Sequence, residues 1–238
     1  MELSQKRMRK QLERMKPLIT GCSMELARKG QDALGALLSR SYHKEVRVEE
    51  VCFPGFPACR IVPRDQSPVG RMLYLHGGGY VCGDLEYAKG FGSVLSAVTG
   101  AEVLCPAYRL APEHPYPAAV EDAMRAWDYL MYQGYGAENV TVAGDSAGGN
   151  LALVLCRRLK AAGRRMPRAL LLMSPWTDMT MSGASYRERV ESDPMLTPEY
   201  IEAVRRAYAG DRDLQDPDLS PLLCLLYTSP SPRDGLLS

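Results

Sequence analysis

Histidine is scarce in this sequence, and the few histidines sit at positions that limit the chemistry of the chain. Among 238 residues there are three: His43, His76 and His114. All three come before Ser146, which lies in a Gly-x-Ser-x-Gly motif. A serine hydroxyl is a weak nucleophile unless a neighbouring base takes its proton, and histidine most often supplies that base. Serine chemistry in this chain therefore depends on where these three side chains lie.

Several other features are missing, and each absence excludes a class of protein. No apolar run reaches the roughly 18–20 residues that a membrane-spanning helix needs, and the charged N-terminus lacks the apolar core of a signal peptide. The seven cysteines form no Cys-x-x-Cys pair, which argues against a disulfide framework and favours a reducing compartment. A net charge of +1 gives no reason to expect a nucleic-acid partner. We therefore expect a cytoplasmic protein without a transmembrane segment or a nucleic-acid partner.

The N-terminal part of the chain has a helical pattern of its own. Apolar residues recur at helical spacing within residues 5–40, with lysine and arginine between them: Met8, Leu12, Met15 and Ile19. The pattern predicts a helical cap over residues 1–43 whose apolar stripe packs on the body of the protein. A helix lying on a membrane surface is the alternative, because the polar face is basic. We favour the cap, since the apolar face carries no aromatic anchor.

Residues 44–222 predict an α/β core in which strands and helices alternate. A hairpin is expected near residues 46–62, and later strands at residues 71–75, 101–106, 139–143 and 169–173. Helices are expected near residues 86–98, 117–133 and 147–162, with a last helix in an irregular insertion, residues 179–210. This order predicts a mainly parallel sheet covered on both faces. The insertion is a candidate wall for a substrate pocket.

Gly144-Asp145-Ser146-Ala147-Gly148 lies between a predicted strand and a predicted helix. A serine on such a sharp turn needs small neighbours, and the turn exposes its hydroxyl at the helix N-terminus. The N–H group of Ala147 then points toward an oxyanion that forms on the substrate. No pair of histidines or carboxylates near Ser146 has metal-ligand spacing, so neither a metal nor another cofactor is expected.

A second glycine-rich segment, His76-Gly77-Gly78-Gly79, ends the strand at residues 71–75. Consecutive glycines let backbone N–H groups point at a ligand without interference from side chains. The spacing fits neither a dinucleotide-binding fingerprint nor a P-loop. The segment therefore predicts the second half of an oxyanion-binding site, with Ala147 as the first half.

These motifs resemble the hormone-sensitive-lipase family of α/β-hydrolases, in its bacterial esterase branch. The resemblance covers roughly residues 40–222 and includes Tyr108–Ala118, Gly144–Asn150, Ser174–Asp178 and Asp216–Leu222 as well as the His76–Gly79 segment. It implies an α/β-hydrolase fold and a serine carboxylic-ester hydrolase acting on small or short-to-medium acyl esters through an acyl-enzyme. It also implies a homodimer for the full-length protein.

By this resemblance, Ser146 is the nucleophile and the N–H groups of Gly78, Gly79 and Ala147 are the oxyanion donors. His76 and Gly77 then have a supporting role, and His76 is not the catalytic base. The resemblance also implies that three charged residues order the loops around the serine: Arg109, Glu113 and Asp145.

The family's catalytic acid and histidine follow the serine along the chain, in that order, and this sequence has no match for either. No histidine follows Ser146, and no later aspartate matches the acid. The resemblance stops at Leu222, and residues 223–238 have no helix or strand pattern after Tyr227. We therefore expect a C-terminal truncation, an unstructured and non-native tail at residues 223–238, an exposed strand edge at residues 169–173, and no activity in this form.

A function from a different class fits the missing histidine directly. A relative that keeps the fold and loses its base would hold a small ligand in the capped pocket without turning it over. The sequence therefore leaves two interpretations, an ester hydrolase and a non-catalytic binding protein.

Overall fold

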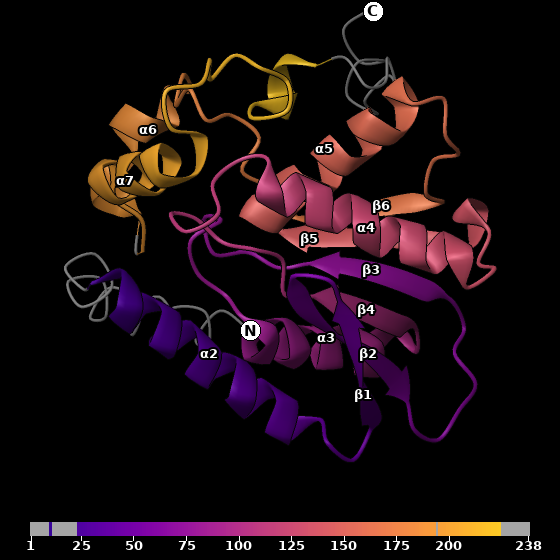
Figure 1. The fold of residues 1–238 in the computed structure, drawn as a ribbon. Helices are drawn as coiled ribbons and strands as arrows, with labels where there is room; N and C mark the ends of the chain where they lie inside the picture. Colours follow the sequence, from indigo (N-terminus) through magenta and orange to yellow (C-terminus); the bar gives the residue numbers. More distant parts are fainter. Residues whose placement is uncertain (1–9, 11–22, 194, 225–238) are drawn as a thin grey trace, which may run out of the picture.

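The structure is a computed structural model that describes residues 10, 23–193 and 195–224. Residues 1–9 and 11–22 of the predicted cap, and residues 225–238 of the predicted tail, lie outside this part. A sheet of six strands organises the molecule in the order β1-β2-β4-β3-β5-β6 (Figure 1). The strands are β1 (Val46–Phe53), β2 (Phe56–Pro63), β3 (Arg71–Leu75), β4 (Glu102–Pro106), β5 (Val140–Asp145) and β6 (Ala169–Met173).

The predicted hairpin and the mainly parallel sheet are both confirmed. Strands β1 and β2 pair antiparallel in register from Val46–Pro63 to Phe53–Phe56, and β2 pairs antiparallel with β4. From β4 onward every pairing is parallel. Because parallel strands share a direction, β3 and β5 end at the same edge of the sheet, and the residues that follow both strands meet there.

Helices cover both faces of the sheet (Figure 1). Figure 1 shows α4 and α5 on one face and α3, with α2 outside it, on the other; α6 and α7 lie at the same end of the molecule as the amino end of α2. The α-helices are α2 (Met24–Ser41), α3 (Leu85–Thr99), α4 (Ala118–Tyr132), α5 (Ala147–Ala161), α6 (Ser185–Glu188) and α7 (Pro198–Ala209). Short 3-10 turns occupy Ala137–Asn139, Val190–Ser192 and Pro221–Leu223. In the described ranges no helix is both long and apolar enough to cross a bilayer.

Strand β3 separates two hydrophobic cores because its side chains alternate between the faces. Leu73 and Leu75 pack in the core that contains α4 and α5, including the buried Trp127. Met72 and Tyr74 pack in the core under α3. Both faces of the central strand are therefore buried, which explains why its sequence is an uninterrupted apolar run after Arg71.

Helix α2 packs against α3 through glycines rather than side chains. A methyl group on Gly35 would lie 2.3 Å from the carbonyl oxygen of Glu86, and one on Gly90 would lie 2.2 Å from the carbonyl oxygen of Gly35. The two backbones therefore approach as closely as helices can. This contact, called here the Gly35–Gly90 seam, fixes α2 on the body of the protein.

Helices α2 and α7 each begin at a side-chain cap. Ser23 accepts a hydrogen bond from the Leu26 N–H at the start of α2, at 3.3 Å. Thr197 does the same for the Tyr200 N–H at the start of α7, at 3.2 Å. Helix α7 lies within the insertion where the last helix was expected, and the Thr197 cap with proline at the next position accounts for its start.

Candidate active site

Ser146 lies on the turn between β5 and α5, in a conformation that few residues adopt. Its backbone angles are φ 51° and ψ −118°, and a positive φ is strained for a residue with a Cβ atom. The turn is held from outside, because the Ser146 N–H donates to Met173 O at 3.0 Å and the Trp176 N–H donates to Ser146 O at 2.9 Å. A methyl group on Gly148 would lie 2.0 Å from the carbonyl oxygen of Leu75, so α5 can approach β3 only with glycine there.

The His76–Gly79 segment forms a tight loop beside this turn. Gly78 and Gly79 have φ angles of 122° and 64°, a region that favours glycine. The Cys82 N–H donates to Gly78 O at 2.9 Å and closes the loop. Within the described residues, no group accepts a hydrogen bond from the N–H of Gly78, Gly79 or Ala147. The three predicted donors are therefore available to a ligand.

One carboxylate joins the loop to the serine turn. Asp145 Oδ1 accepts from the Gly77 N–H at 2.9 Å and from the Tyr74 hydroxyl at 2.7 Å. Burial, together with the Asp145 charge, raises the pKa of the Tyr74 hydroxyl well above its ordinary value, so it remains a donor. The supporting position predicted for Asp145 and Gly77 thus has a direct geometric basis.

The His76 side chain is fully buried. Its ring stacks on Tyr108 with centroids 4.1 Å apart, and its Nδ1 lies 2.8 Å from Gly77 O. Burial lowers the pKa of His76, so the neutral ring with a proton on Nδ1 is the form that satisfies this contact. His43 and His114 are exposed. None of the three histidines lines the cavity that contains Ser146.

That cavity has a volume of about 930 Å³ and opens above Ser146, Gly78 and Gly79. Its walls are mostly apolar and come from two parts of the chain that the sequence set apart as cap and insertion. One wall belongs to α2 and the other to the segment from α6 to α7: Leu26, Ala27 and Leu34 on the first; Tyr186, Met195, Leu196, Ile201 and Val204 on the second. An apolar cavity with a few convergent polar groups is the usual form of a small-molecule site.

Asn150 is a supporting residue to which the sequence assigned no role. Its Nδ2 donates to Trp176 O at 2.7 Å and to Leu219 O at 2.9 Å, and its Oδ1 accepts from the Tyr80 hydroxyl at 2.7 Å. Asn150 thereby ties the helix after the serine to two later loops, one of which carries the cavity residue Trp176. The only hint of this role in the sequence was an asparagine in the first turn of the helix that follows the serine.

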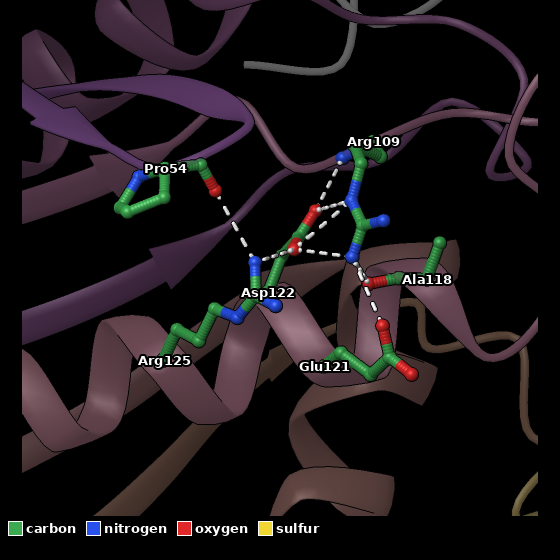
Figure 2. Close-up of polar contacts among 6 residues, drawn as sticks. All are labelled: Pro54, Arg109, Ala118, Glu121, Asp122 and Arg125. Carbon is green, nitrogen blue, oxygen red and sulfur yellow. Dashed lines mark hydrogen bonds and ion pairs between the residues drawn. The ribbon is translucent and has the colours of Figure 1, made fainter.

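Arg109 and Glu113, which the resemblance assigned to loop ordering, lie between β4 and α4, and each forms an ion pair there. Arg109 binds the fully buried Asp122 through Nε at 2.9 Å and through a second guanidinium nitrogen at 2.8 Å, and it also reaches Glu121 (Figure 2). Glu113 forms a salt bridge at 2.7 Å with Arg28 of α2. The Arg28 hydrogen bond lowers the pKa of Glu113 to about 2, so this link between α2 and the loop persists over a wide pH range.

A second acidic contact between α2 and the body is expected to make stability depend on pH. The Asp84 N–H donates to Asp32 Oδ1 at 3.2 Å. Burial, followed by the Asp84 carboxyl group, raises the pKa of Asp32 from 3.8 to about 6. The folded form then binds this proton more tightly than the unfolded form, so the free energy of unfolding rises as pH falls from 7 to 5. Solvent screening limits the gain to about 1 kcal/mol.

Urea unfolding at pH 7 and pH 5 measures this gain. Asp32→Asn is expected to remove the part of the pH dependence that belongs to Asp32 and to stabilise the protein at pH 7. An Asp32→Asn variant with the same pH dependence as the unmodified chain would contradict the assignment.

Several known proteins similar to this chain are named as esterases or acetyl-hydrolases. A family model described as the alpha/beta hydrolase fold matches residues 72–231. The chain is 39% identical over 150 residues to an acetyl-hydrolase of Streptomyces hygroscopicus, which is 63% of this chain and 50% of that protein. It is 37% identical over 191 residues to an esterase of Acinetobacter venetianus, which is 74% of this chain and 63% of that protein. The chain thus spans about half to two thirds of the length of these relatives.

Solved structures of esterases also superpose on this chain. The crystal structure of EstE5 soaked with ethyl alcohol superposes with a TM-score of 0.83 at 33% identity, over 92% of this chain and 73% of that chain. An esterase from the bacterial hormone-sensitive lipase family superposes with a TM-score of 0.79 at 29% identity, over 92% and 74% of the two chains. With its mainly parallel sheet and its Gly-Asp-Ser-Ala-Gly turn, the chain belongs to the hormone-sensitive-lipase-like bacterial esterases, a family of α/β-hydrolases that cleave carboxylic esters.

Proposed function

We propose that Ser146 is the nucleophile of a serine carboxylic-ester hydrolase and that its substrates are small or short-to-medium acyl esters. One observation carries the proposal: Ser146 occupies a strained turn beneath an apolar cavity, beside backbone N–H groups that no described residue uses. Such a turn presents a hydroxyl to a ligand at a helix N-terminus, where developing negative charge is stabilised. The cavity of about 930 Å³ has room for an ester of this size.

The reaction then proceeds by acyl transfer. Ser146 Oγ attacks the ester carbonyl carbon, and the resulting oxyanion accepts hydrogen bonds from the N–H groups of Gly78, Gly79 and Ala147. The alcohol leaves, an ester to Ser146 remains, and water releases the acid. Asp145 acts through Gly77: by holding that N–H it keeps the oxyanion loop beside the serine turn.

Proton transfer is the step for which the described part of the chain places no histidine at the cavity. A base must take the Ser146 proton, and the three histidines lie away from the cavity. We therefore propose that the 238-residue chain by itself turns over esters poorly. Ester hydrolysis by the whole protein, its homodimer and its cytoplasmic location remain predictions.

A non-catalytic binding protein is the second candidate function. The observation that favours it is the same apolar cavity without a histidine in its walls. Both candidates predict that small esters bind beside Trp176. Only the first predicts that Ser146 reacts when a base is supplied.

Added imidazole tests the two candidates, because a free base can enter the cavity and replace the missing group. We expect imidazole to accelerate p-nitrophenyl acetate hydrolysis by the chain, with an imidazole-dependent rate roughly 10-fold or more above that of Ser146→Ala. The Ser146→Ala variant also measures the reaction of imidazole with the ester in solution. Ser67→Ala, at an exposed position in the loop before β3, is the matched control and should behave like the unmodified chain.

Binding is measured separately by fluorescence. Trp176 lines the cavity, whereas the other tryptophan, Trp127, is buried in the core. A saturable change in tryptophan emission with butyrate esters, together with equal imidazole-dependent rates for Ser146→Ala and the unmodified chain, would support the binding protein and reject the hydrolase.

A further inference from the structure

Helix α2 contacts the His76–Gly79 loop and the residues after it through two side chains. Arg28 Nε donates to Val81 O at 2.6 Å, and Gln31 Nε2 donates to Gly77 O at 3.5 Å. Residues three apart lie on the same face of a helix, so one face of α2 contacts this segment at two points. Gln31 in addition lines the cavity of the candidate active site.

The Gln31 amide lies along the peptide group that joins Gly77 to Gly78. Its Nε2 contacts the carbonyl oxygen of Gly77, and a methyl group on Gly78 would lie 3.1 Å from its Oε1. Burial, followed by the Asp145 charge, raises the pKa of the Tyr87 hydroxyl to about 12, and a hydrogen bond with Gln31 acts in the opposite direction. The Gln31 amide is therefore enclosed between the glycine loop and Tyr87, which also lines the cavity.

A contact at Gly77 O has an effect on the Gly78 N–H because the two belong to one peptide group. This group is planar and trans, so its C=O and N–H point in opposite directions. Glycine has no Cβ atom to restrict the torsions on either side, and the direction of the group depends on contacts such as this one. His76 Nδ1 lies 2.8 Å from the same oxygen, which can accept two hydrogen bonds.

We propose that Gln31 is a positioning residue, which by donating to Gly77 O directs the Gly78 N–H toward the oxyanion that forms on the substrate. This inference rests on the proposed function, in which Gly78 is an oxyanion donor. Gln31 acts through the loop and not on the reacting atoms. Because Gln31 belongs to α2, this helix contributes to stabilisation of the transition state as well as to the wall of the cavity.

Nuclear magnetic resonance can observe this peptide group almost alone. The chain contains three Gly-Gly peptides: Gly77–Gly78, Gly78–Gly79 and Gly148–Gly149. With glycine labelled at the carbonyl carbon and at nitrogen, an HNCO spectrum shows only these three signals. Gln31→Met keeps the length and helix propensity of the side chain, and we expect it to shift the Gly77–Gly78 signal more than the Gly148–Gly149 signal. Gln133→Met, at an exposed position after α4, is the matched control and should shift neither.

Kinetics connects this peptide group to the reaction. In imidazole-dependent hydrolysis of p-nitrophenyl acetate, Gln31→Met is expected to lower the rate at saturating ester at least about 5-fold, less than removal of a whole oxyanion donor would. The affinity for butyrate esters, followed by tryptophan emission, should change less than about 2-fold, since the lost contact acts in the transition state. A role confined to packing of α2 would lower stability and leave both the signal and the rate unchanged.

A second variant covers the case in which Gln31→Met does not fold, which circular dichroism checks. Gln31→Glu retains the length of the side chain, has no N–H when ionised, and should shift the same signal. A Gly77–Gly78 signal that moves no more than in Gln133→Met would overturn the proposal. A chain that reacts through Ser146 at a rate insensitive to Gln31→Met would reject this proposal alone, whereas a chain with no Ser146-dependent rate would reject the proposed function as well.

Discussion

Replacing Gly148 with alanine is expected to lower the free energy of unfolding by about 3 kcal/mol or more. The added methyl group would lie 2.0 Å from Leu75 O and 2.5 Å from His76 O. Both neighbours are backbone atoms, which cannot rotate aside as the end of a flexible side chain can. Helix α5 must therefore move away from β3, and the Ser146 turn and the His76–Gly79 loop move with it. Urea unfolding followed by circular dichroism measures the loss.

The same substitution at Gly30 is the control, with an expected effect of opposite sign. Gly30 lies within α2, and a methyl group there would meet no atom within 4 Å. Alanine is a better helix former than glycine, so Gly30→Ala should stabilise the protein by up to about 1 kcal/mol. If Gly148→Ala were as stable as Gly30→Ala, the close approach of α5 and β3 would be refuted.

Replacing Arg109 with methionine is expected to destabilise the protein by about 3–4 kcal/mol. Asp122 has no exposed side-chain surface, and Arg109 supplies most of the hydrogen bonds to its carboxylate (Figure 2). Without the guanidinium group, the buried Asp122 carboxylate keeps, among the described residues, only the Arg109 backbone N–H and a longer contact with Arg125. Thermal and urea unfolding at pH 7 provide the measurement.

Arg125 offers the matched control for this variant. It is 49% exposed and lies 3.7 Å from the same carboxylate, and it also donates to Pro54 O (Figure 2). Because exposed ion pairs contribute little, Arg125→Met should change stability by less than about 1 kcal/mol. Equal losses from Arg109→Met and Arg125→Met would show that the geometry around Asp122 is not what stabilises this loop.

The sequence predicted best those elements whose position is set by residues adjacent in the chain. Strand 71–75 ends directly in the glycine loop, and strand β5 ends directly in the serine turn. Parallel strands then bring the two ends together, so the positions of Gly78, Gly79 and Ser146 follow from local pattern and sheet direction alone. The predicted bounds of β3 and β6 are confirmed residue by residue because both are short apolar runs between polar turns.

The supporting contacts could not be predicted, because they join residues that are distant in the chain. Asn150 binds the carbonyl of Leu219, and Asp32 meets Asp84. No periodicity or motif encodes either pair; each exists only once helices α2 and α5 are placed. The contact between His76 and Tyr108 is of the same kind: the stacking of the two rings places a buried histidine directly after β3, and only the folded chain brings the two residues together.

The Gly35–Gly90 seam has a consequence for how new substrate ranges can evolve. One wall of the cavity belongs to α2, whose backbone contacts the backbone of α3. Replacing Gly35 or Gly90 with a larger residue would therefore destabilise the fold. The opposite wall includes the short α6 and the 3-10 turn Val190–Ser192, in which no residue is buried, while the end of α7 is anchored by the buried Tyr208 stacked on Tyr80. Under the proposed function, selection for longer or wider esters can thus reshape one side of the cavity while the other retains its form.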